Sequence, residues 1–412
     1  MKKISYLITV ALAILMASCS ASDIVGSTDD KAPSSATDFT NSDVKILLAS
    51  KTAAVGSNVT ESAKATRAII NSDDNLCFNA KGIGIFCLAT RQMANGSNLS
   101  IDWSRYVANG YSIWLNNVAA DAVIKQDINS NEYTDITWED NKARYYPTGN
   151  AHAYSFYGLY PRSTTLNYSQ DSITATVAVD GHTDILYGKA ENLTDDYAYS
   201  AKYFRANPAL DGTAEMTFNH LLMGLTFNII AGADTTYDSS TQTEVQSYTK
   251  ALNTYVDSIE IENVPTALKV NIANKADKSH EGTSFRDEST TSTANMYIRN
   301  ADGTAFTPVA PATTGTAIGD TLLVPVPSSD TYYMKVHLAY HTKTSAGADA
   351  IVYMNSPVTI PLTLKKGVSF QQGHYYVVHL TVYGPQEIKL NAKLNAWSKG
   401  DDAFITTTGE VD

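Results

Sequence analysis

Two histidines are spaced so that they could share a metal ion. His337 and His341 stand four residues apart, which on a helix would place both imidazoles on one face, where a cation such as Zn²⁺ could bind them. The surrounding segment Val336–Tyr340 has the composition of a strand, however. Four residues of a strand span about 13 Å, which is too far for two imidazoles to reach one ion. We therefore predict no metal site here.

Two acidic pairs could supply the carboxylates of general acid–base catalysis. They are Glu139–Asp140, which follows Trp138, and Asp401–Asp402. Neither pair has the sequence context of a glycosidase, and the chain contains no G-x-S-x-G, H-E-x-x-H or Walker-type glycine motif. His220 lies in the apolar segment Phe218–Leu222, which favours a hydrogen-bonded structural histidine over a catalytic one. The sequence therefore predicts neither an enzyme nor a cofactor.

Aromatic side chains could instead form a platform on which sugar rings stack. The candidates are Trp103, Trp114, Tyr145, Tyr146 and Tyr157. The alternative is that these rings fill the core and the strand faces, which is the more common position of large aromatic side chains. We favour the core.

Cys19 has a sequence context that predicts a covalent modification. Lys2 and Lys3 precede an apolar run from Leu7 to Met16, which is shorter than the roughly 20 residues of a membrane-spanning helix and predicts a secretory signal. The small residues that come directly before Cys19 resemble a bacterial lipobox. Residues 1–18 would then be a lipoprotein signal peptide, and Cys19 would become the acylated N-terminus. The alternative is an ordinary signal peptide with a chance cysteine.

The other two cysteines, Cys77 and Cys87, leave two alternatives open. They flank Lys81 and Gly82, and a hairpin centred on Gly82 would place them opposite one another, where a disulfide could form in an oxidising compartment. Two small buried thiols are the other possibility, and we favour it.

Composition bounds the partners of the protein. The chain has 412 residues, 43% of them hydrophobic, with 30 basic and 42 acidic residues and a formal charge of −12. Loss of Lys2 and Lys3 with the signal leaves 28 basic residues, so the charge becomes 28 minus 42, or −14. Because no basic run or patch stands out, we predict no nucleic-acid binding.

The segment before residue 67 predicts a strand on a tether. Residues 20–42 are polar and nearly free of large apolar groups, as in a disordered linker. Val44–Ser50 is a compact apolar run with strand character, and it should pair within the first domain. Lys51–Thr66 is weakly structured and ends at Arg67, so a protease could reach that residue.

The rest of the chain predicts an all-β fold. Strand-like segments are separated by turn residues, and no long segment has a helical period. The predicted strands are Ile83–Leu88, Tyr111–Leu115, Tyr154–Tyr160, Ser172–Val179, Met216–Ile230, Ser258–Glu262, Thr321–Val326, Tyr332–Tyr340, Val358–Leu364, Tyr375–Tyr383 and Ile388–Trp397. Many short strands at fairly regular spacing suggest β-sandwich domains. The polar stretch 231–250 lies between two strand-rich halves and is the predicted domain junction.

A series of short motifs, taken in order, resembles the fimbrillin family of Bacteroidetes, the subunits of type V pili. The motifs are Ala65–Ala68, Gly82–Phe86, Tyr145–Pro147, Tyr154–Pro161, Asp184–Gly188, Phe218–Leu222, Ser258–Asn263, Leu323–Pro327, Gly373–Tyr376 and Asn395–Trp397. The resemblance covers roughly residues 65–400 and follows a lipobox. It implies two transthyretin-like β-sandwich domains in tandem. With it, we expect a tether and removable first strand over residues 19–67, an N-terminal domain over 68–235 and a C-terminal domain over 236–412.

The resemblance also implies a function and a way of assembly. The chain would be a structural subunit of a surface pilus that supports cell adhesion, anchored by its lipid at the outer membrane. A trypsin-like protease would cut between Arg67 and Ala68, with Lys64 as a second candidate, and release the strand Val44–Ser50. A donor strand from another pilus subunit, of the same or another kind, would then fill the groove. In this chain the donor would contain Phe404, Ile405 and Thr406, within Ile388–Asp412.

Two alternatives to this function remain. In tip or anchor members of the family both ends of the chain would complete their own domains, without exchange. In a different class of protein, the chain would be a monomeric surface glycan-binding lipoprotein.

Overall fold

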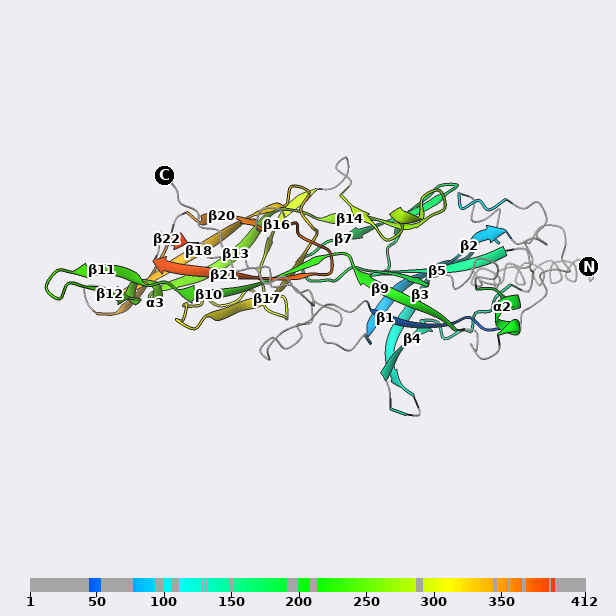
Figure 1. The fold of residues 1–412 in the computed structure, drawn as a ribbon, viewed down its shortest axis with the longest axis horizontal. Helices are drawn as coiled ribbons and strands as arrows, with labels where there is room; N and C mark the ends of the chain where they lie inside the picture. The colour runs from blue at the N-terminus through cyan, green and yellow to red at the C-terminus, as the bar shows by residue number, and fades with distance from the viewer. Residues whose placement is uncertain are drawn as a thin grey trace, which may run out of the picture.

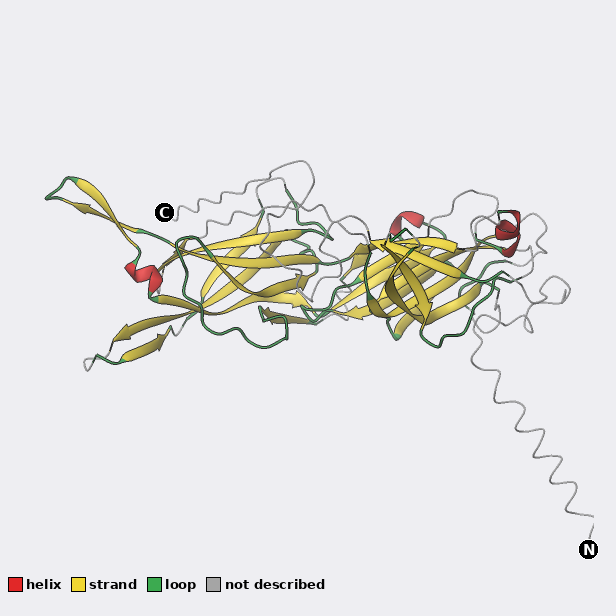
Figure 2. Cartoon of the chain, turned by 90° about the horizontal axis from the view of Figure 1, so that it is seen from below, coloured by secondary structure: helices red, strands yellow, loops and turns green. Residues whose placement is uncertain are grey.

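The described part of the protein is elongated and consists almost entirely of β-strands (Figure 1 and Figure 2). The structure is a computed structural model that describes residues 44–52, 77–92, 100–104, 111–127, 129–130, 132–147, 152–190, 199–207, 213–286, 292–343, 347–354, 356–364, 368–384 and 387–389. Its helices are short: α2 (Ala201–Ala206), α3 (Thr249–Leu252) and the 3-10 turn η3 (Lys278–His280). In these ranges no helix is long and apolar enough to span a membrane. The all-β prediction is confirmed.

A closed barrel occupies the end of the molecule nearest the N-terminus (Figure 1). Its strands follow one another around the barrel in the order β1-β4-β3-β2-β5-β8-β9. They are β1 (Leu47–Thr52), β2 (Ala80–Gln92), β3 (Ile113–Gln126), β4 (Glu132–Trp138), β5 (His152–Tyr160), β8 (Leu186–Ala190) and β9 (Thr213–His220).

The remaining strands form sheets outside the barrel (Figure 1). One sheet has the order β15-β14-β7-β6, a second β17-β10-β21-β22, and a third β16-β13-β18-β19, with β20 also pairing with β18. Their bounds are β6 (Thr165–Tyr168), β7 (Ser172–Ala178), β10 (Met223–Ala231), β13 (Thr254–Pro265), β14 (Ala267–Asn274), β15 (Ser284–Phe285), β16 (Thr293–Tyr297), β17 (Thr316–Val324), β18 (Thr331–Lys343), β19 (Asp349–Tyr353), β20 (Val358–Thr363), β21 (Tyr375–Gly384) and β22 (Glu387–Lys389).

Strand pairing links early and late parts of the chain. β7 pairs antiparallel with β14, and β10 pairs with β17 and β21, so both sheets contain residues from each side of the predicted junction. The junction segment 231–250 forms the hairpin of β11 (Asp234–Asp238) and β12 (Thr243–Ser247) with the start of α3, at the end of the molecule opposite the barrel (Figure 1). The division into two transthyretin-like domains at residues 235–236 stays a prediction.

The core continues through the barrel wall because central strands are buried on both faces. In β2, Ile83 and Ile85 point into the barrel and belong to its interior cluster, whereas Phe86 and Leu88 belong to a second cluster outside it. The second cluster extends through β7 and β14 to the far sheets. Burial of both faces explains why these strands have nearly continuous apolar sequences rather than strict alternation.

One prediction about β2 is wrong. Gly82 does not centre a hairpin: it has a φ of +79° at a bulge, where the pairing register with β3 shifts between Lys81 and Ile83. β2 therefore continues as a single strand towards Cys87, about 30 Å along an extended chain from Cys77. No disulfide joins the two cysteines; Cys87 is fully buried, and burial raises the pKa of its thiol. Of the two buried thiols that the alternative predicted, Cys87 is buried as expected, whereas Cys77 is partly exposed.

A buried carboxylate fastens the β14–η3 segment to the outside of the barrel. The Glu281 side chain is only 3% exposed and forms an ion pair with Lys189 of β8. Its Oε1 accepts hydrogen bonds from the Tyr157 hydroxyl of β5, at 3.1 Å, and from the Asn274 amide, at 3.2 Å. Because the charge is paired and hydrogen-bonded, its burial does not leave an uncompensated ion. The ion pair of this cluster joins Lys189 and Glu281, which are 92 positions apart in the chain.

Phe218 is fully buried inside the barrel, and Leu222 and Leu225 are buried in the cluster outside it. Its ring packs edge-on against Phe78, with 5.4 Å between the ring centroids. The ring lies so close to the neighbouring strands that a Cβ added at Gly188 would come within 2.5 Å of it. The glycine at this position therefore makes room for the phenylalanine.

We expect Phe218→Ala to destabilise the barrel by about 3–5 kcal/mol, because it removes a buried ring and leaves a cavity. Thermal unfolding followed by circular dichroism measures the effect. Phe285→Ala is the matched control, because that ring is 42% exposed and its loss should change the melting temperature little. Equal effects of the two substitutions would contradict the assigned core.

Candidate functional site

The first described strand, β1, is the element that closes the barrel. On one side it pairs antiparallel with β4, where Leu48 lies opposite Ile136. On the other side it pairs parallel with β9, from Leu47 opposite Thr213 to Thr52 opposite Phe218. The prediction that Val44–Ser50 pairs within the first part of the fold is confirmed, although the strand itself runs from Leu47 to Thr52.

The side chains of β1 and its approach alternate between the core and the surface. Ile46, Leu48 and Ser50 are buried, whereas Lys45 and Leu47 are exposed. Ile46 and Leu48 belong to the interior cluster of the barrel, together with Phe218. Complete burial of an aliphatic side chain contributes about 1.5–3 kcal/mol, so these two side chains are a large part of what holds the strand.

A loop after β4 fixes the beginning of this segment. The Ile46 amide donates to the Arg144 carbonyl at 2.8 Å, and the Tyr146 amide donates to the Val44 carbonyl at 3.0 Å. The Arg144 guanidinium is itself held by Asp140 at 2.7 Å. Burial acts to raise the pKa of Asp140, but hydrogen bonds from Arg144 and the Lys142 amide outweigh it and lower that pKa.

β1 occupies a slot between β4 and β9, and this slot is suited to bind an extended strand. Without β1, strands β4 and β9 would each expose a row of backbone N–H and C=O groups, and the barrel interior would open beside them. Unpaired backbone groups next to an apolar interior are costly, so an empty slot favours another extended segment. Such a segment needs apolar side chains at every second position, as Ile46 and Leu48 supply here.

The residues predicted for modification, cleavage and donation lie outside the described ranges. This applies to Cys19, to Lys64 with Arg67 and Ala68, and to Phe404, Ile405 and Thr406. In chain order, Arg67 and Ala68 fall between β1 and β2. The acidic pair Asp401–Asp402 is also outside.

A buried ion pair joins two of the predicted motifs. Nδ1 of His220, at the end of β9, lies 2.7 Å from Oδ2 of Asp184, just before β8. Burial acts to lower the pKa of His220, but the Asp184 carboxylate outweighs it by charge and hydrogen bonding and raises that pKa. The sequence interpretation of His220 as a hydrogen-bonded structural residue is confirmed.

The other residues that the sequence analysis considered for chemistry make contacts within the fold. The predicted strand around the two remaining histidines is confirmed: His341 stacks on Tyr255, with 3.8 Å between ring centroids, and His337 lies 3.6 Å from Glu260. Over the described ranges, no group of three or more His, Cys, Asp and Glu side chains could hold a metal ion. Asp140 is paired with Arg144, as described above.

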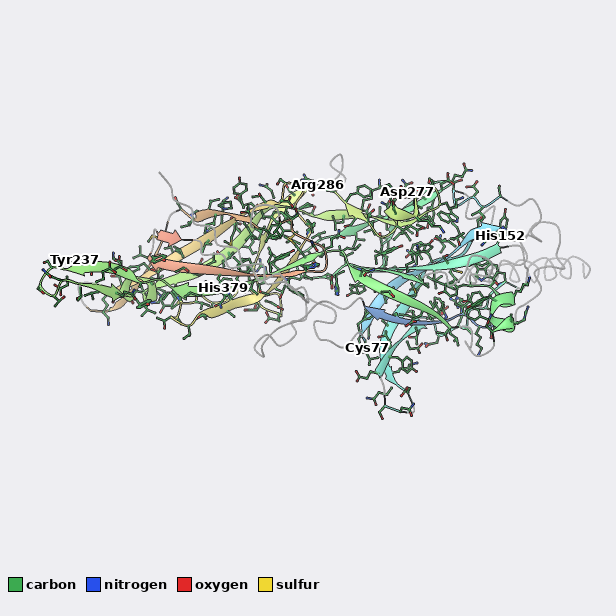
Figure 3. The ribbon with its side chains drawn as sticks, in the orientation of Figure 1. Cys77, His152, Tyr237, Asp277, Arg286 and His379 are labelled. Carbon is green, nitrogen blue, oxygen red and sulfur yellow. The ribbon has the colours of Figure 1, made fainter. Side chains whose placement is uncertain are left out.

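The aromatic platform considered from the sequence is largely core. Trp103, Trp114, Tyr146 and Tyr157 are at most 3% exposed, and only Tyr145 of that set lies at the surface. Exposed tyrosines occur elsewhere, among them Tyr237 on the β11–β12 hairpin (Figure 3) and Tyr297 at the end of β16. His152, also labelled in Figure 3, lies at the barrel end.

Sequence reasoning missed the groups that hold β1 in place. Arg144 lies in an irregular loop without any pattern, and the carbonyl that binds the Ile46 amide is part of the backbone. The parallel partner β9 is more than 160 residues away from β1. The motifs Asp184–Gly188 and Phe218–Leu222 were found, but nothing in them showed that Asp184 and His220 meet.

The fold is that of an all-β protein in which β1 closes a barrel by pairing with β4 on one side and β9 on the other. The chain belongs to the fimbrillin-like family, whose family model matches residues 66–397. No curated protein matches it significantly.

Similar solved structures are fimbrial proteins of low sequence identity. A fimbrial protein from Bacteroides vulgatus is 11% identical, with a TM-score of 0.49 over 86% of this chain and 99% of that one. The tip fimbrial protein Mfa3 from Porphyromonas gingivalis is 9% identical, with a TM-score of 0.33 over 85% of this chain and 98% of that one. The fimbrial anchor protein Mfa2 of the same organism is 8% identical, with a TM-score of 0.32 over 85% and 98%.

We expect Leu48→Ala to weaken the attachment of β1 by about 2–5 kcal/mol, because the side chain is buried in the barrel. The melting temperature should fall. Leu47→Ala is a control of the same residue type on the same strand, and its side chain is 43% exposed. If both variants melt alike, β1 does not occupy the slot as described.

The His220–Asp184 pair should make stability depend on pH. Because folding raises the pKa of His220, its contribution is complete below the unfolded value of about 6.5 and is lost as pH rises through the folded value. His220→Gln should therefore reduce the difference in melting temperature between pH of about 6 and about 8. His280→Gln, in the exposed pair with Asp277, should leave that difference unchanged. An unaltered pH profile in His220→Gln would refute this role.

Proposed function

We propose that the protein is a structural subunit of a surface pilus, assembled by exchange of its first strand and supporting cell adhesion. Membership of the fimbrillin-like family supports the role of a pilus subunit, and this is a structural rather than a catalytic role. The observation that carries the assembly mechanism is the position of β1 between β4 and β9. β1 is the part of the barrel that a cut before β2 would disconnect.

Cleavage between Arg67 and Ala68 is the first step of this proposal. It lies in the connection from β1 to β2, so it would leave β1 held only by ladder hydrogen bonds and by side chains such as Ile46 and Leu48. Each ladder hydrogen bond contributes only about 0.5–1.5 kcal/mol net to holding the strand. A strand with better contacts could therefore replace β1.

The incoming strand would come from the C-terminal segment of another subunit. In the run from Phe404 to Thr408, every second residue is Phe404, Thr406 and Thr408. The inward positions of the slot hold Ile46, Leu48 and Ser50. The two sets agree at the first, apolar position and at the last, hydroxyl-bearing position, whereas Thr406 would stand where the slot holds the apolar Leu48. A donor in this register would place its phenylalanine in the apolar end of the barrel and a threonine near the position of Ser50.

Limited trypsin digestion of the purified full chain should produce a new N-terminus at Ala68, followed by polymers that resist heating on a gel. Arg67→Ala should abolish polymerisation, and so should truncation before Phe404. Lys64→Ala alone is the matched control and should polymerise normally. Polymers formed by the double variant with both substitutions would refute assembly by this cut.

Acylation of Cys19 would place the subunit at the outer membrane before assembly. The lipobox-like context of Cys19 supports this step. Cells that express Cys19→Ala should accumulate the precursor and incorporate no fatty-acid analogue into this protein. Labelling of the variant at the level of the unsubstituted protein would rule out this anchor.

A further inference from the structure

A small cavity opens beside the third sheet, outside the barrel. It has a volume of about 120 Å³ and is open to solvent. It lies where β16 ends, next to its partner strand β13. The cavity is lined by Asp257, Ser258, Tyr297, Ile298, Arg299, Ala305 and Phe306.

Backbone irregularities place the polar side chains of this cavity. The pairing register between β13 and β18 shifts between Val256 and Ser258, so Asp257 is the extra residue of a bulge. Bulges of this kind redirect a side chain out of the regular sheet pattern. Between the lining residues Arg299 and Ala305 the chain makes a turn closed by two backbone hydrogen bonds of 2.8 Å, from the Asn300 amide to the Thr304 carbonyl and from the Gly303 amide to the Asn300 carbonyl.

Tyr297 gives the cavity a fixed aromatic wall. Its side chain is 41% exposed, and its hydroxyl is hydrogen-bonded to Glu260, which also accepts a hydrogen bond from Asn295 at 3.2 Å. The guanidinium carbon of Arg299 lies 5.9 Å from the centre of the tyrosine ring. Ring and guanidinium are therefore held in place before any ligand arrives, which lowers the entropic cost of binding.

The charges of the cavity are opposite and are not paired with one another. No ion pair joins Asp257 to Arg299, and within the described ranges neither side chain has another ion-pair partner. The carboxylate can accept hydrogen bonds and the guanidinium can donate them. Within the lining itself these two charges balance, and the nearby Glu260 carboxylate is not part of the lining.

We infer that this cavity binds a neutral sugar ring of a glycan. A sugar has an apolar C–H face, which would lie against Tyr297, and adjacent hydroxyl groups, which would donate to Asp257 and accept from Arg299. A mostly apolar wall with a few convergent polar groups is the usual composition of a small-ligand site. Only one edge of the ring would enter, because the cavity volume of about 120 Å³ is smaller than the roughly 300 Å³ or more of a pocket that encloses a whole ligand.

The outer face of the same sheet can accommodate a second sugar residue. Tyr297 lies opposite Glu260, which lies opposite Lys335, so all three share one face. Tyr333 is two residues before Lys335 on β18, hence on the same face, and it is 53% exposed. A glycan that leaves the cavity over Glu260 would reach Tyr333, so the site favours the end of an oligosaccharide.

The biological use of this site rests on the proposed role in adhesion, but the measurement of sugar binding does not depend on that role. Binding is measured on the purified full chain by isothermal titration and saturation-transfer NMR. The probes are methyl glycosides of mannose, galactose, fucose and N-acetylglucosamine, with N-acetylneuraminic acid and glucuronic acid as acidic probes. Cleavage and polymerisation of the same samples provide an independent readout of assembly.

We expect at least one neutral glycoside to bind with a millimolar or better dissociation constant. Asp257→Asn and Arg299→Gln should each weaken that binding by at least about tenfold, because each removes hydrogen bonds to a charged group. The matched controls Asp238→Asn and Tyr237→Ala, on the β11–β12 hairpin, should bind like the unsubstituted protein, and all four variants should polymerise normally.

Two results would overturn the inference. One is the absence of binding by every neutral glycoside at millimolar concentration, or binding that Asp257→Asn and Arg299→Gln leave unchanged. The other is preferential binding of the acidic sugars that is lost in Arg299→Gln but kept in Asp257→Asn, which would define an anion site instead. Neither result would affect the polymerisation readout, so failure of this site and failure of the proposed assembly are distinguishable.

Discussion

The barrel depends on the hydrogen bonds that β1 makes on both of its sides. The order β1-β4-β3-β2-β5-β8-β9 closes only because β1 joins β4 to β9. Every other neighbouring pair in the barrel is antiparallel, and the parallel pair between β1 and β9 is the exception. An open barrel would have two free strand edges beside its apolar interior, and free edges are the sites at which β proteins recruit further strands. The same backbone groups of β4 and β9 can therefore be satisfied in two ways: by β1, which closes the barrel, or by another strand.

The parallel pairing also means that no tight turn connects β1 to its neighbour β9. Neighbouring antiparallel strands can be joined by a tight turn, but a parallel neighbour must arrive by a long connection. β1 reaches β9 only through the rest of the barrel, and it reaches β2 through residues 53–79. Its place is therefore determined by side chains such as Ile46 and Leu48 and by the Arg144 carbonyl, rather than by a turn. Contacts of this kind do not require that the strand and the barrel belong to one chain.

The sequence predicted a strand well where the whole apolar segment belongs to a single sheet. Tyr375–Tyr383 was predicted as the strand that became β21, and Val44–Ser50 anticipated β1 to within a few residues. Met216–Ile230 was predicted as one strand, but the chain breaks at Leu221 and Leu222, where it leaves the barrel for the next sheet. Both sides of that break are buried, so apolar composition gave no sign of it. Partners such as Asp184 and His220, or β1 and β9, depend on long-range topology that local patterns do not contain.

Exchange of a strand at one end requires that the rest of the molecule remains folded. The cluster that begins at Phe86 and Leu88 on the outer barrel wall continues without a break to the far sheets, and β1 contributes nothing to it. The buried Glu281 adds a polar link between β14 and the barrel strands, again without β1. Local units of a protein can open at a cost well below that of global unfolding when few contacts cross between them and the remainder. The buried side chains Ile46 and Leu48 belong to the barrel interior alone, so we expect the larger core to stay folded when β1 is lost. Of the residues that line the cavity beside Tyr297, Ile298 and Phe306 belong to that larger core, and none lies on β1, β4 or β9.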